Sequence, residues 1–156
     1  MVDFVADTSL PPPPPTRLER LQTTFENRFP KAYLDFLDRG NGAKLVNNEV
    51  ASAVRPFVIE RFLPIVADPK TDPSGWTDVA VVTTQLDARL VSDENATGID
   101  LIPIAAMFAG DFVVLDYREN RTEPSVGIWD HEVSDDFAPK VETIAPTFSA
   151  FLSMMR

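Results

Sequence analysis

The sequence contains no cysteine, one histidine and only six glycines in 156 residues. Without cysteine the chain forms no disulfides and performs no thiol chemistry, which is typical of proteins from a reducing cytosol. It also has no uninterrupted run of ~18 apolar residues, the length that a membrane-spanning helix requires. The beginning of the chain is acidic, whereas a secretory signal begins with a basic segment followed by a long apolar run. We therefore predict a cytoplasmic protein that does not bind a membrane.

Sequence motifs for phosphate binding and for nucleophilic catalysis are also absent. The chain has no Gly-x-Gly-x-x-Gly or P-loop segment, and no Gly-x-Ser-x-Gly segment that would present a nucleophilic serine. A Ser-His-Asp arrangement would have to use His131, the only histidine. His131 stands near the end of a predicted strand, where we expect a structural histidine that hydrogen-bonds at the sheet edge. These observations predict a protein that is not an enzyme and uses no cofactor.

Carboxylates surround His131 and are candidate metal ligands: Asp130, Glu132, Asp135 and Asp136. The group lacks a second histidine and the ligand spacing of a calcium-binding EF-hand loop. We interpret it as a solvated acidic loop and predict no metal site. Asp111 and Asp116 lie at an odd separation, so on one strand their side chains would face opposite sides. A shared two-carboxylate site between them is therefore not expected.

The net charge of -10 is distributed unevenly along the chain. Residues 1–56 carry seven basic and seven acidic side chains, whereas residues 57–156 carry seven basic and 17 acidic ones. Direct binding to nucleic acid is disfavoured, because phosphates are neutralised by clustered lysine and arginine. A basic protein is the better partner for the acidic half, and solubility alone is the other interpretation.

The length and the apolar fraction of 44% are those of one globular domain. Five consecutive prolines, Pro11 to Pro15, must lie in the extended polyproline II conformation. Such a run could be a ligand for an SH3-type domain, but it is more often a stiff spacer in front of a domain. We therefore divide the chain into an N-terminal arm, residues 1–15, and one domain, residues 16–156. We expect the arm to be stiff or loosely docked, and its removal to cost little stability.

Two helices are predicted at the start of the domain. The segment from Thr16 to Glu19 has the capping-box pattern, and apolar residues at helical spacing follow it to about residue 27. A second helix follows Pro30, which suits the first turn of a helix because it has no N–H to leave unpaired. Its apolar face includes Tyr33 and Phe36, and Gly40 is expected to end it as a left-handed cap.

Short segments rich in Val, Ile and Phe predict an antiparallel sheet for the rest of the chain. The predicted elements are strands within 49–63 with a break near residues 55–56, a loop over 68–75, a helix from residue 77 or 78 to about 90, strands over 102–108, 112–117 and 126–131, and a last helix. Thr143 could cap the last helix, which contains Phe148 and Phe151. We expect Trp129 to be a core residue together with Tyr33 and Phe36.

The segments 29–42, 102–111, 128–131 and 144–152 resemble, in order and spacing, the motifs of the SUKH superfamily, the Smi/Knr-type proteins. In the first, Phe29-Pro30, Tyr33, Phe36-Leu37 and Asn41-Gly42 stand where the family has Leu-Pro, Tyr, Phe-Leu and Asn-Gly. The later matches are Ile102-Pro103-Ile104-Ala105 with Gly110-Asp111, Ile128-Trp129-Asp130-His131, and Ile144-Ala145 with Phe148, Phe151 and Leu152. The resemblance covers roughly residues 16–155, whereas residues 64–99 match poorly. It implies an α+β fold in which helices surround a mostly antiparallel sheet.

The resemblance also implies a function. Most bacterial members are immunity proteins that block a cognate toxin, often a nuclease, by binding it. Fungal members are regulatory adaptors in cell-wall synthesis, and a hydrolase that uses His131 is a third possibility for this chain. The family has no shared catalytic residues, so the resemblance assigns none. The sequence leaves the oligomeric state open.

The candidate toxin-binding residues are the acidic ones that packing explains least: Asp93, Glu94, Asp100, Asp130, Glu132, Asp135 and Asp136. We expect these carboxylates to attract a basic toxin and to exclude other partners. Affinity would then require an apolar or aromatic anchor, which the sequence does not locate.

Overall fold

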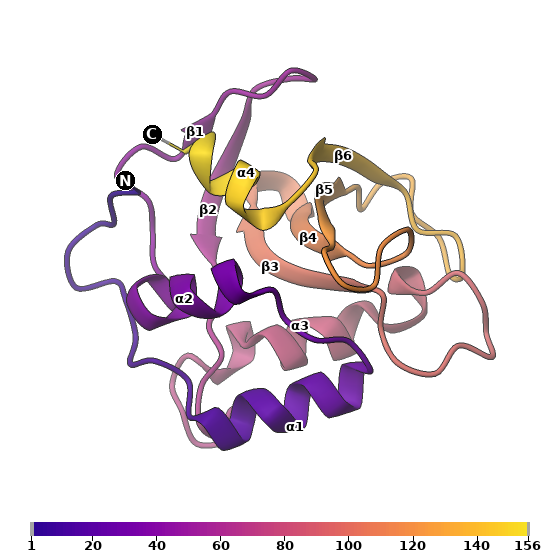
Figure 1. Ribbon diagram of the computed structural model, residues 1–156, viewed down its shortest axis with the longest axis horizontal. Coiled ribbons are helices and arrows are strands. Elements are labelled where there is room, and N and C mark those ends of the chain that lie inside the picture. The colour runs from indigo at the N-terminus through magenta and orange to yellow at the C-terminus, as the bar shows by residue number, and fades with distance from the viewer. Residues whose placement is uncertain (1, 156) are drawn as a thin grey trace.

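The computed structural model describes residues 2–155 and has an α+β fold (Figure 1). Its six strands form one sheet in the order β1-β2-β3-β4-β5-β6, and every neighbouring pair is antiparallel. The strands are β1 Glu49–Val50, β2 Phe57–Phe62, β3 Leu101–Met107, β4 Phe112–Asp116, β5 Ser125–Trp129 and β6 Val141–Ala145. The predicted fold class and the meander are confirmed.

Four α-helices and three short 3₁₀ turns accompany the sheet in this part of the chain. They are α1 Pro15–Phe25, α2 Lys31–Gly40, α3 Val79–Leu86 and α4 Phe148–Ser153, with η1 Gly75–Thr77, η2 Asp87–Leu90 and η3 Phe108–Gly110. Helices α1 and α3 run side by side on one side of the sheet, and α4 lies against β5, β6 and α2 (Figure 1). None of the helices in residues 2–155 has the length and apolar character needed to cross a membrane.

Aromatic rings fill the core between the helices and the sheet. The Tyr33 ring lies 5.3 Å from that of Phe148, and the Phe36 ring lies 5.6 Å from it. Trp129, Tyr33 and Phe36 are at most 4% exposed, which confirms that they are core residues. Burial raises the pKa of the Tyr33 phenol well above its ordinary value, so this hydroxyl stays protonated.

Two helix N-caps were predicted at the wrong residues. Helix α1 begins at Pro15 with Pro14 as its N-cap, so the Thr16 hydroxyl lies inside the helix and caps nothing. The fixed φ angle of proline suits the first helical position, which explains the earlier start. Thr143 belongs to β6, a strand that the sequence did not predict, and the last helix is capped by Thr147, whose hydroxyl accepts a hydrogen bond from the Ala150 N–H. Pairing of residues 141–145 with β5 is a tertiary interaction that the local pattern does not reveal.

Gly40 is not the left-handed cap that the sequence predicted. It is the last residue of α2, and the positive φ angle of 72° belongs to Gly42. A Cβ atom on Gly40 would lie 2.6 Å from the Phe4 ring and 2.7 Å from the Phe36 ring. Glycine is therefore needed at position 40 for close packing, and at position 42 for its backbone conformation.

The N-terminal arm packs against the domain, so the prediction of loose docking is wrong for residues 2–11. Val2 is 8% exposed, and the Phe4 ring lies 5.6 Å from the Phe36 ring in an edge-to-face arrangement. Backbone hydrogen bonds join the arm to residues 41–46, and the side-chain amide of Asn41 donates to the carbonyl of Pro11. Pro14 is extended, with φ -60° and ψ 140°, but Pro15 is the first residue of α1, so the prediction that all five prolines are extended is wrong at Pro15. The residues before the proline run supply apolar side chains and backbone donors.

This packing makes Phe4 a test of the arm. Replacing Phe4 with alanine should lower the free energy of unfolding by about 1–2 kcal/mol, because an aromatic pair and partly buried apolar area are lost. Urea unfolding followed by fluorescence measures the change. Val5→Ala is the matched control, since Val5 is 41% exposed and should matter little. Equal stabilities of the two variants would mean that the arm does not dock in solution.

Candidate binding surface

Hydrogen bonds hold the segment between β5 and β6, residues 130–140, against η2. The indole N–H of Trp129 donates to the carbonyl of Arg89 at 3.0 Å, and the Arg89 guanidinium lies 4.8 Å from the Trp129 ring centroid. The same guanidinium donates to the carbonyls of His131 and Ser134. The Phe137 N–H donates to the carbonyl of Ala88 at 2.8 Å. These contacts fix the position of an exposed acidic segment relative to the end of α3.

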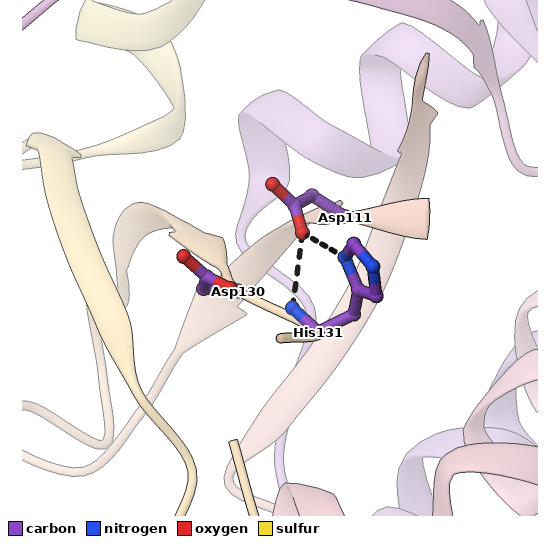
Figure 2. Close-up of side chains that lie close together, drawn as sticks. All are labelled: Asp111, Asp130 and His131. Carbon is purple, nitrogen blue, oxygen red and sulfur yellow. Dashed lines mark hydrogen bonds and ion pairs between the residues drawn. The ribbon is translucent and has the colours of Figure 1, made fainter. Parts of the chain in front are cut away.

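His131 is hydrogen-bonded at the end of β5, as the sequence predicted. Figure 2 shows that one carboxylate oxygen of Asp111 accepts from the His131 backbone N–H at 2.9 Å and lies 2.7 Å from its Nδ1. The antiparallel register pairs Phe112 with Trp129 and so places Asp111 beside this turn. Asp116 lies at the other end of β4 and pairs with Arg118. As predicted, Asp111 and Asp116 do not share a site.

Asp111, Asp130 and His131 are the one group in residues 2–155 whose ligand atoms could surround a metal ion, with all three atoms within 4.8 Å of one another. The metal-ligand candidates chosen from the sequence did not include Asp111. Pairing of residues 112–116 with 125–129 in a hairpin would have predicted its place beside His131. These atoms already have partners: Asp111 binds His131, and Asp130 accepts from the backbone N–H groups of Glu132 and Val133. Figure 2 shows the Asp130 carboxylate pointing away from the imidazole. These hydrogen bonds explain the cluster without a metal ion, because they hold the turn that follows β5.

A catalytic triad with Asp111 and His131 would require a nucleophile. Ser134 is the candidate, because it lines the same surface hollow as His131. The Ser134 hydroxyl oxygen instead accepts a hydrogen bond from the Lys140 N–H at 2.9 Å, and the residue is 3% exposed. Within residues 2–155 no hydroxyl is hydrogen-bonded to the His131 ring. Tyr117 follows the other end of β4, where burial raises the pKa of its phenol and its hydroxyl donates to the carbonyl of Arg28.

The predicted toxin-binding residues separate into two groups in the structure. Asp100 pairs with Arg121 and also accepts from the Asn27 side chain, and Asp130 caps the turn after β5. The other five are exposed on the surface: Asp93, Glu94, Glu132, Asp135 and Asp136. Of the seven, Asp100 is the one with an ion-pair partner in residues 2–155. Asp130 and Asp93 each accept from backbone N–H groups, Asp93 from that of Asn95 at 2.9 Å, but Asp93 and the other four in its group are exposed to solvent.

Phe137, a residue that the sequence analysis missed, adjoins four of the five exposed acidic residues, and Glu132 lines a separate hollow with Asp135 and Asp136. Phe137 lines the same cleft as Asp93 and Glu94, and it directly follows Asp135 and Asp136 in the chain. It is 42% exposed and has a positive φ angle of 59°, which is unusual for a bulky residue. An aromatic residue within a polar, acidic loop was the available signal. We call these five residues, Asp93, Glu94, Asp135, Asp136 and Phe137, the acidic surface.

Gly98 fixes the segment that carries Asp93 and Glu94. Its φ angle is 78°, and a Cβ atom there would lie 2.6 Å from the carbonyl oxygen of Phe25. The next residue, Ile99, donates its N–H to that same carbonyl at 2.8 Å. The absence of a side chain at position 98 lets the segment approach the end of α1, and this contact forms one wall of the cleft.

A six-stranded antiparallel meander with helices packed around it defines an α+β domain whose exposed loops carry its acidic surface. The chain belongs to the SMI1/KNR4 family (SUKH-1), whose family model matches residues 12–154. This confirms the resemblance found in the sequence, and the match also spans residues 64–99, where the individual motifs were poor. In a comparison with curated proteins, none matched the chain.

Proposed function

We propose that this protein is a non-catalytic immunity protein, which binds a cognate basic toxin in the cytoplasm and blocks it by direct contact. Membership of the SMI1/KNR4 family supports a role of this general kind. The net charge of -10, confined to residues 57–156, favours a basic partner. A nuclease toxin fits this chemistry, because proteins that bind nucleic acid carry clustered lysine and arginine.

The observation that carries the proposal is the composition of the acidic surface. Two acidic pairs, Asp93 with Glu94 and Asp135 with Asp136, are far apart in the sequence but adjoin one exposed aromatic side chain, Phe137. Carboxylates at the margin of an interface speed encounter with a basic partner and exclude acidic ones. A central aromatic residue supplies the buried apolar area on which affinity depends. The arrangement thus provides both parts of a protein-binding site.

An immunity protein of this kind should be encoded beside its toxin, so the test takes the product of the neighbouring gene and measures its association rate at low and at raised salt. Replacing Asp93 and Glu94 with serine should lower the association rate roughly tenfold at low salt, because steering by exposed charges is lost. Replacing Asp135 and Asp136 with serine should have a similar effect. Both differences should shrink at raised salt, since exposed charges are then screened.

Asp35 and Asp38 provide a matched control, because they are exposed on α2, away from the acidic surface (Figure 1). Their double replacement with serine removes the same charge and should leave the association rate within about twofold of the original. Association that is insensitive to salt and to both acidic double variants would contradict electrostatic recognition. An adjacent toxin that this protein neither binds nor inhibits would overturn the immunity proposal itself.

A further inference from the structure

A cleft with a volume of about 480 Å³ lies between the ends of α1 and α3, beside the acidic surface. Phe25 and Ile99 contribute apolar walls, Val91 and Ala88 continue them, and Phe137 closes one side. Clefts that receive small ligands have volumes of about 300–1,000 Å³ and mostly apolar walls with a few polar groups. The cleft is therefore large enough to receive a side chain of a partner.

The charge in this cleft is entirely negative. Three of its lining residues are acidic, Asp87, Asp93 and Glu94, and the lining includes no lysine, arginine or histidine from residues 2–155. The ion pairs found in that same range involve none of the three carboxylates. A concave surface of one charge sign focuses the electric field and attracts the opposite charge. The complementary ligand is therefore a cation.

The aromatic side of the cleft narrows the choice of cation. Phe137 is partly exposed and is held in place by the hydrogen bond from its N–H to Ala88 on η2. A cationic group over the face of an aromatic ring is attracted by the ring's quadrupole, and arginine makes such contacts more often than lysine. Guanidinium is planar, is weakly hydrated and pairs with carboxylates through two parallel hydrogen bonds.

We infer that this cleft receives an arginine side chain of the protein partner. The guanidinium would pair with Asp93 and Glu94 and stack on Phe137, while its aliphatic stem contacts the apolar walls. The inference rests on the proposed function, since it names the partner group that the acidic surface recognises. It adds a contribution to affinity to the steering by Asp93 and Glu94, whereas Asp135 and Asp136, outside this cleft, contribute to the steering of encounter alone.

The experiment titrates the ¹⁵N-labelled full chain with the peptide Ac-Gly-Arg-Gly-NH₂ and follows amide chemical shifts. Saturable shifts should appear in residues 83–99 and at Phe137. The lysine peptide should bind roughly tenfold more weakly, because it lacks the planar fork and stacks less well. The citrulline peptide, which keeps the shape without the charge, should cause no saturable shift. No saturation with the arginine peptide, equal binding of the lysine peptide, or shifts centred elsewhere would each overturn the inference.

Substitutions of cleft residues test whether the arginine peptide binds in this cleft. Asp93→Asn combined with Glu94→Gln should weaken binding of the arginine peptide at least about tenfold, the loss expected for charge-assisted pairs. Phe137→Leu keeps an apolar side chain and should weaken it severalfold by removing the aromatic face. Asp35→Asn with Asp38→Asn, two exposed carboxylates on α2, is the matched control and should bind almost normally. Thermal unfolding of each variant verifies that it is folded, and unchanged binding to the Asp93/Glu94 variant would contradict the site.

The outcome is separable from that of the proposed function. Salt-dependent toxin binding without peptide binding would overturn the arginine site and leave the immunity proposal standing. Peptide binding in this cleft without toxin binding would overturn the immunity proposal and leave the arginine site standing.

Discussion

Replacing Asp78 with alanine should lower the free energy of unfolding by about 3–5 kcal/mol, the usual cost of removing one member of a buried ion pair. The Asp78 side chain is fully buried and lies 3.1 Å from the guanidinium of Arg17, which is itself 10% exposed. It also accepts from the N–H groups of Val66 at 2.9 Å and Ala80 at 2.8 Å, so it caps α3 and holds the preceding loop. The alanine variant leaves a buried cation and two backbone donors without this partner.

Urea unfolding of the wild type and the variant measures this loss. Asp78→Asn is the informative companion, because its amide oxygen retains one acceptor for the helix cap while the charge is removed. It should be destabilised less than the alanine variant. Asp35→Ala, which breaks the exposed Lys31–Asp35 pair on α2, is the control and should leave the midpoint nearly unchanged. An Asp78→Ala variant as stable as this control would show that the buried pair does not join α1 to α3.

Replacing Phe36 with alanine should cost about 3–5 kcal/mol, as for other buried aromatic residues, because both burial and ring contacts are lost. The Phe36 ring lies 4.5 Å from that of Phe62 and 5.6 Å from those of Phe4 and Phe148. It thus joins the arm, the sheet and α4. Since domains are stable by about 5–15 kcal/mol in total, this variant should be close to unfolding at room temperature.

Thermal and urea unfolding measure the effect of Phe36→Ala. Phe108→Ala is its matched control, because Phe108 is 58% exposed at η3 and its removal leaves no cavity. The control should unfold at nearly the wild-type midpoint. A stable Phe36→Ala variant would mean that the three ring contacts are not maintained in solution.

Much of the candidate site could be predicted from the sequence, but which of its carboxylates form ion pairs within the protein could not. Asp93, Glu94, Asp135 and Asp136 were selected because packing did not explain them, and they are exposed. Asp100 was selected on the same grounds, yet it pairs with Arg121 from a distant loop. A carboxylate that forms an ion pair and one that does not look alike in the sequence, because the basic partner comes from another part of the chain. The proposed anchor, Phe137, had a signal in the sequence, an aromatic residue in an acidic loop, but the cleft that it lines is formed with segments distant in the sequence.

Local physical chemistry determined the elements and the core of this protein. Helical spacing placed Tyr33 and Phe36 on a buried face, Asp78 is the cap of α3, and the short apolar segments formed the meander. These features follow from spacing, backbone conformation and turn residues within a few positions.

Only the tertiary structure decided which distant segments meet. The docking of the arm, the pairing of β6 with β5 and the attachment of residues 130–140 to η2 depend on hydrogen bonds and ring contacts between remote positions. Such contacts form where packing brings a donor and an acceptor together, and no local pattern encodes this. The sequence therefore determined the acidic character of the protein, whereas the fold brought Asp93 and Glu94 to the same cleft as Phe137.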